Sequence, residues 1–128
     1  MGETHFLEVA HELEDVGLLW QPEIGDEVFG RFDPQTVSVL VDTAGMRPNE
    51  LRESYLWLPT VEQMILQIEV RQGILFHAGL ELSESSFCYK TVIHARGESV
   101  QATGISFRNS VGRALRDLLL VEKGNGIH

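Results

Sequence analysis

The sequence predicts an α+β fold, a two-layer sandwich in which an antiparallel sheet is covered by helices. Apolar residues recur at three- and four-residue steps over about 5–16, 60–72 and 107–121, and this period predicts three amphipathic helices. Over about 74–104 the apolar period changes to two, which predicts a three-strand meander with one apolar face. Helices must cover such a face, so a sandwich follows. The 128 residues suit one globular domain over 1–128.

The first third of the chain is expected to form a helix, a loop and a hairpin. Thr4 can cap the first helix, which Gly17 ends. After a loop, residues 28–32 and 36–42 flank Asp33-Pro34-Gln35, and alternating valines in the second stretch predict a β-hairpin.

Two helix starts follow in the middle of the chain. Pro48 suits the first position of a short helix over 48–54. Thr60 and Gln63 have the spacing of a capping box, and the apolar stripe behind them ends before Gly73. The sequence therefore predicts a short helix and then a longer amphipathic one.

The meander begins with two strands that can be registered across the loop Ser83-Glu84-Ser85-Ser86. Leu82 then faces Phe87, and His77 faces Val92. The expected inner, apolar face collects Ile74, Phe76, Ala78, Leu80, Leu82, Phe87, Tyr89, Thr91, Ile93 and Ala95. The expected outer face collects Leu75, His77, Gly79, Glu81, Cys88, Lys90, Val92 and His94.

A two-residue turn at Gly97-Glu98 adds the third strand, which places Val100 and Ala102 on the inner face. Ser106 can then cap the last helix, whose apolar stripe includes Leu115. These elements complete the predicted sandwich.

Charge is distributed unevenly along the chain. The net charge of −9 argues against general nucleic-acid binding, which draws on clustered Lys and Arg. Residues 1–82 carry 4 Lys and Arg against 15 Asp and Glu, a balance of −11, whereas residues 83–128 carry 6 against 4, a balance of +2. This polarity suits self-association, or contact between a basic C-terminal face and an acidic partner.

The cysteine count and the N-terminus bear on location. Cys88 is the single cysteine, which excludes an intrachain disulfide and is typical of a reducing compartment. The first ten residues lack the basic start and apolar run of a signal peptide, and no run of about 18 apolar residues occurs. We expect a cytoplasmic protein without a membrane segment.

Three residues on the outer face are candidates for a ligand site or an interface, namely His77, Glu81 and His94. Their nitrogen and oxygen donors could serve a small metal-dependent enzyme, but a diagonal pair of histidines lies roughly 7 Å apart and a third close ligand is missing. A solvated face is the favoured interpretation. No catalytic motif occurs, so we predict no catalytic residue, metal or cofactor.

The aromatic residues Trp20, Tyr55 and Trp57 flank loops near Pro22 and Pro59. Such side chains can line a ligand pocket, or they can cover the open edge of a small core. The covering role is the favoured interpretation.

The chain has two resemblances. Residues 57–64 (WLPTVEQM), followed by a meander and an Ala- and Leu-rich helix, resemble small uncharacterised bacterial proteins of prophage type with an α/β sandwich. This implies a compact domain that acts by association. Residues 87–119 are similar in topology to the back half of a double-stranded-RNA-binding domain, although 106–109 (SFRN) offer one cation where that family places several.

Together these observations favour a non-enzymatic protein-binding or self-assembling domain, with a homodimer as the expected form. The alternative is an accessory nucleic-acid-binding domain that uses Arg108, Arg113 and Arg116 on the last helix. A small metal-dependent enzyme is the third possibility.

Overall fold

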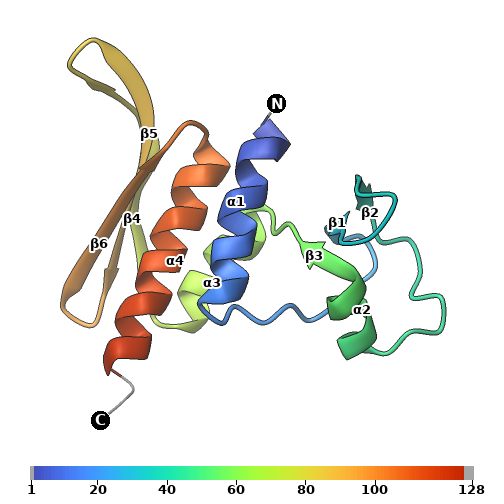
Figure 1. The fold of residues 1–128 in the computed structure, drawn as a ribbon. Helices are drawn as coiled ribbons and strands as arrows, with labels where there is room; N and C mark the ends of the chain where they lie inside the picture. The colour runs from blue at the N-terminus through green and yellow to red at the C-terminus, as the bar shows by residue number, and fades with distance from the viewer. Residues whose placement is uncertain (1, 126–128) are drawn as a thin grey trace.

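The computed structural model describes residues 2–125, and it confirms the α+β class (Figure 1). Within these residues the chain forms four helices and six strands. In order they are α1 (Gly2–Asp15), β1 (Glu27–Gly30), β2 (Val37–Val39), α2 (Pro48–Ser54), β3 (Tyr55–Trp57), α3 (Val61–Val70), β4 (Ile74–Ser83), β5 (Ser86–Ala95), β6 (Glu98–Gly104) and α4 (Phe107–Asn125).

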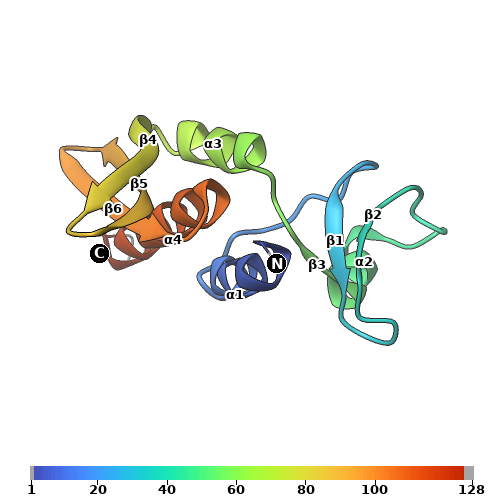
Figure 2. The same cartoon turned by 90° about the horizontal axis from the view of Figure 1, so that it is seen from above.

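The strands form two separate antiparallel sheets, with the orders β2-β1-β3 and β4-β5-β6. The predicted hairpin and the predicted meander are therefore both confirmed. In Figures 1 and 2, α4 lies along the meander, α1 packs against α4, and the small sheet with α2 lies beyond α1. The small sheet gains a third strand, β3, which the sequence did not predict.

The main apolar cluster lies between the meander, α1, α3 and α4. Its fully buried members include Phe6 and Val9 of α1, Ile93 of β5 and Leu115 of α4. Gly112 allows α1 to approach α4 closely, because a Cβ there would stand 2.5 Å from Cγ1 of Val9. The apolar faces that the 3.6-residue period predicts for α1 and α4 are thus the faces buried in the structure.

A second, smaller cluster joins the small sheet to α2. It consists of Trp20, Val28, Leu40 and Leu51. Trp57 of β3 packs against both clusters, so this strand connects the two parts of the molecule.

The register of the β4–β5 hairpin follows the prediction over most of its length, since Leu82 pairs with Phe87 and His77 pairs with Val92. Its loop is tighter than predicted, because the strands continue to Ser83 and Ser86 and leave two residues between them.

At the start of β4 the predicted faces are wrong. A bulge between Leu75 and His77 shifts the register, so that Leu75 lies opposite Ile93 and packs against the core. Phe76 instead stacks on His94 of the outer face, with ring centroids 4.3 Å apart, and Ile74 is 66% exposed. The extra residue of a bulge reverses the inward and outward alternation on one side of it. Phe76 and Ile93 therefore lie on opposite faces.

The turn from β5 to β6 also differs by one residue from the prediction. It uses Arg96 and Gly97, whose φ angles are 53° and 81°. Positive φ at both central residues is the requirement of the type I′ turn that favours tight hairpins. Val100 still lies on the buried face.

None of the helices in the described part of the chain has the length and apolar character needed to traverse a lipid bilayer.

Candidate functional site

The outer face of the meander brings two of its three candidate residues together. His77 Nε2 lies 3.3 Å from Glu81 Oε2, and Lys90 Nζ lies 3.9 Å from the other oxygen of Glu81. His94 stacks on Phe76 instead. Among the side chains that the structure describes, no group of three or more His, Cys, Asp and Glu is arranged to hold a metal ion.

Two of the three candidate arginines are engaged inside the protein. Arg108 Nε donates to Pro59 O at 2.9 Å, and its Nη2 donates to Leu58 O at 2.7 Å and to Glu27 Oε1 at 3.0 Å. Its guanidinium also lies 4.1 Å from the centroid of the Phe6 ring. Arg108 is therefore a junction between α4, α1 and the small sheet.

Arg116 lies between two carboxylates. Its Nη1 donates to Glu12 Oε1 at 2.9 Å, and its Nε donates to Asp117 Oδ1 at 3.0 Å. Burial opposes the charge, but hydrogen bonds and charges from Asp117 and Glu12 outweigh burial and raise the pKa of Arg116.

Arg113 differs from the other two, because its Nε is buried and has no hydrogen-bond partner. Oδ1 of Asn109, a residue only 2% exposed, is also buried without a hydrogen-bond partner. Both residues line a cavity of about 260 Å³ at the start of α4, whose wall also includes Glu8, Phe87 and Ile105. Two residues of this wall thus each keep a buried polar atom without a partner, which is unusual because buried polar groups are nearly always paired.

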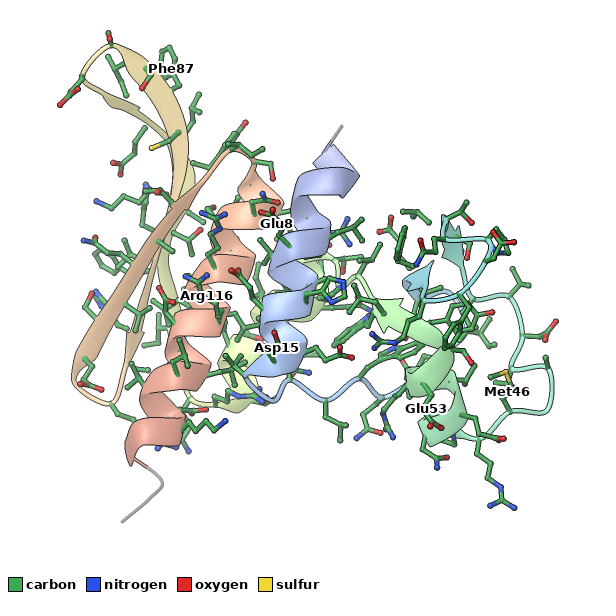
Figure 3. The ribbon with its side chains drawn as sticks, viewed as in Figure 1. Glu8, Asp15, Met46, Glu53, Phe87 and Arg116 are labelled. Atoms are coloured by element: carbon green, nitrogen blue, oxygen red, sulfur yellow. The ribbon has the colours of Figure 1, made fainter. Side chains whose placement is uncertain are left out.

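An exposed apolar patch adjoins this cavity. We call it the hairpin surface, and it consists of Leu80, Leu82, Phe87 and Ile105, which are 55%, 64%, 67% and 65% exposed. Leu80, Leu82 and Phe87 lie on the predicted face of the sheet. They are exposed because the end of the hairpin extends beyond the helices (Figure 1), and Figure 3 shows Phe87 at that end. Contiguous apolar patches larger than a few hundred Å² mark interaction sites.

The same end of the hairpin has an unpaired strand edge. β5 pairs with β4 from Ser86 onward, but its pairing with β6 starts only at Tyr89, opposite Gly104. Phe87 and Cys88 therefore have a paired strand on one side only. Such an edge is a template for pairing with another chain.

The alternation of β4 and β5 predicted Leu82 and Phe87 as core residues, so sequence reasoning missed the hairpin surface. Strand length carries a signal that could have found it. β4 and β5 have 10 residues each and β6 has 7. At about 3.3 Å per residue, the hairpin outruns its neighbour by roughly 10 Å.

Comparison of the chain with known protein families, with curated protein sequences and with solved structures finds no match in any of the three. The resemblance to prophage-type proteins stays a prediction.

Proposed function

We propose that this protein is a non-enzymatic interaction domain that forms a homodimer through the hairpin surface. The observation that carries the proposal is the exposure of four large apolar side chains, three on the β4–β5 hairpin and the fourth, Ile105, directly after β6. Burial of such side chains at a contact removes them from water, at a gain of about 25 cal/mol per Å².

The charge distribution favours a second copy as the occupant. The hairpin surface has no charged member, and its four residues divide equally between the acidic stretch 1–82 and the weakly basic stretch 83–128. Contact through these uncharged side chains adds no direct charge repulsion between two chains whose net charge is −9.

The strand edge suits twofold symmetry. Antiparallel pairing of residues 87 and 88 with the same residues of a second copy gives both strand edges a partner, because a twofold interface places identical surfaces against each other.

Sedimentation velocity at tens of micromolar tests the proposal. We expect a dimer for the natural chain and a monomer for Leu82→Lys, since a buried unpaired charge opposes association. Leu66→Lys is the matched control, because Leu66 of α3 is 56% exposed and lies outside the hairpin surface. A monomeric natural chain overturns the homodimer, and a dimeric Leu82→Lys variant overturns the surface.

A cytoplasmic location belongs to the same proposal, on the ground that Cys88 is free and suits a reducing compartment. The geometry gives no support to a second, nucleic-acid-binding function, because Arg108 and Arg116 direct their donors to groups of the protein itself.

A further inference from the structure

A cavity of about 190 Å³ lies where the two apolar clusters meet. It is bordered by the end of α1, the connection that follows it, α2 and β3. Its apolar wall includes Leu13, Leu18, Trp20, Tyr55, Trp57 and Pro59. Trp20 of the connection after α1 and the two aromatic residues of β3, Tyr55 and Trp57, thus border one space. Ligand sites occur preferentially at such junctions between packed units.

Most polar groups of the wall are already paired. Trp20 Nε1 donates to Asp26 Oδ2 at 2.8 Å, and Arg52 Nε donates to the carbonyl oxygen of Trp20 at 2.6 Å. Glu14 forms an ion pair with Arg31. Because the charged groups named here are already paired, a neutral ligand suits the cavity.

Trp57 is the exception, because its Nε1 is shielded from solvent and has no hydrogen-bond partner. An unsatisfied buried donor costs roughly 1–3 kcal/mol. A ligand that supplies an acceptor recovers this loss once the side chains that cover the indole N–H move aside, because the N–H is closed to solvent in the structure. The indole of Trp57 also borders a neighbouring hollow over Asp26, Gln63 and Leu66. A test must therefore separate the two spaces.

We propose that the cavity binds a neutral compound with a single aromatic ring and one hydrogen-bond acceptor, which accepts from Trp57 Nε1. The volume fits one ring, since a dry apolar cavity of about 150 Å³ holds benzene. The aromatic walls offer the edge-to-face and offset contacts that ring pairs prefer. This site is independent of the hairpin surface.

Fluorine NMR on the full chain tests the proposal with two probes that differ in the acceptor, 4-fluorobenzamide and 4-fluorotoluene. We expect both to bind, the benzamide more tightly. Trp57→Phe keeps one aromatic ring but loses the N–H together with the second ring of the indole, so we expect it to weaken the benzamide about fivefold more than it weakens the toluene. An equal effect of Trp57→Phe on both probes overturns the hydrogen bond.

Two further variants locate the bound probe, with far-UV circular dichroism as the check on folding. Leu18→Phe narrows the cavity and should abolish binding of both probes, whereas Leu66→Ala alters only the neighbouring hollow and should leave binding unchanged. Undiminished binding to Leu18→Phe, or no binding of either probe to the natural chain at millimolar concentration, overturns the site.

Discussion

At the scale of single residues, Arg108 joins three parts of the molecule through one guanidinium group. It donates to the carbonyl oxygens of Leu58 and Pro59 and to Glu27, and it covers the ring of Phe6. We expect Arg108→Ala to lower the free energy of unfolding by about 2–4 kcal/mol, because it leaves partly buried acceptors without donors. Urea denaturation measures the loss.

Arg108→Lys and Lys123→Ala serve as controls for this prediction. Lysine keeps the charge but not the fork of donors, so it should recover less than half of the loss. Lys123 is exposed near the end of α4, and its removal should change stability by less than about 0.5 kcal/mol. A loss below about 1 kcal/mol for Arg108→Ala contradicts the junction role.

The close packing of α1 against α4 depends on the absence of a side chain at Gly112. A methyl group at this position would approach Cγ1 of Val9 at 2.5 Å and Cε1 of Phe6 at 3.3 Å. We expect Gly112→Ala to destabilise the protein by about 1–3 kcal/mol, because overpacking between α1 and α4 outweighs the better helix propensity of alanine. Thermal and urea unfolding measure the change.

Gly124 provides the matched control in the same helix, because nothing lies within 4 Å of a Cβ built there. Gly124→Ala should be neutral or stabilising by up to about 1 kcal/mol. Equal effects of the two substitutions would show that helix propensity, not the contact with Val9, decides the result.

At the scale of elements, Asp26 fixes the loop after α1 to the start of α3. Its Oδ2 accepts from Trp20 Nε1 and from the backbone N–H of Glu23, and its Oδ1 accepts from Gln63 Nε2 at 2.8 Å. Both carboxylate oxygens accept from donors. An asparagine at this position must therefore turn its NH₂ group, itself a donor, toward one of these donors. We expect Asp26→Asn to cost about 2–4 kcal/mol in urea unfolding.

Asp42→Asn is the control, because Asp42 is exposed and a single oxygen accepts from the N–H of Ala44 at 2.7 Å. Asparagine keeps that acceptor, so the change should be within about 0.5 kcal/mol. If Asp26→Asn is equally mild, the network does not hold the loop.

Elements that depend on neighbouring residues could be predicted from the sequence. The capping box is one, since Thr60 Oγ1 accepts from Gln63 N at 3.1 Å and Gln63 Oε1 accepts from Thr60 N at 2.9 Å. Ser106 is another, because its Oγ accepts from Asn109 N at 3.0 Å. Both signals lie within four residues of the chain.

Elements that depend on distant contacts were missed for a physical reason. β3 has three residues and exists because Leu56 finds Phe29 of β1 as a partner. The bulge at Phe76 brings Leu75 opposite buried Ile93, a choice that alternation within β4 cannot show. The hairpin surface was predicted as core, because alternation reports the face of Leu82 and Phe87 but not whether a helix reaches them.

At the scale of the whole molecule, the two apolar clusters are coupled through β3. Trp57 contacts both clusters, and the ion pair of Arg31 with Glu14 connects the end of β1 to α1. We therefore expect one cooperative unfolding transition. Leu51→Ala, a change in the smaller cluster, should cost about 2–5 kcal/mol and shift the tryptophan fluorescence and the far-UV circular dichroism midpoints equally. A fluorescence transition that precedes the loss of helix would show that the smaller cluster unfolds alone.

Association through the hairpin surface makes stability depend on concentration. A dimer that unfolds to separate chains gains about 1.4 kcal/mol per dimer for each tenfold rise in protein concentration, by mass action. For a chain of 128 residues we expect the melting midpoint to rise by about 2–4 °C per tenfold increase. Leu82→Lys should abolish the dependence and Leu66→Lys should keep it, because only the first places a charge on the hairpin surface. A midpoint of the natural chain that is constant from micromolar to hundreds of micromolar contradicts association through this surface.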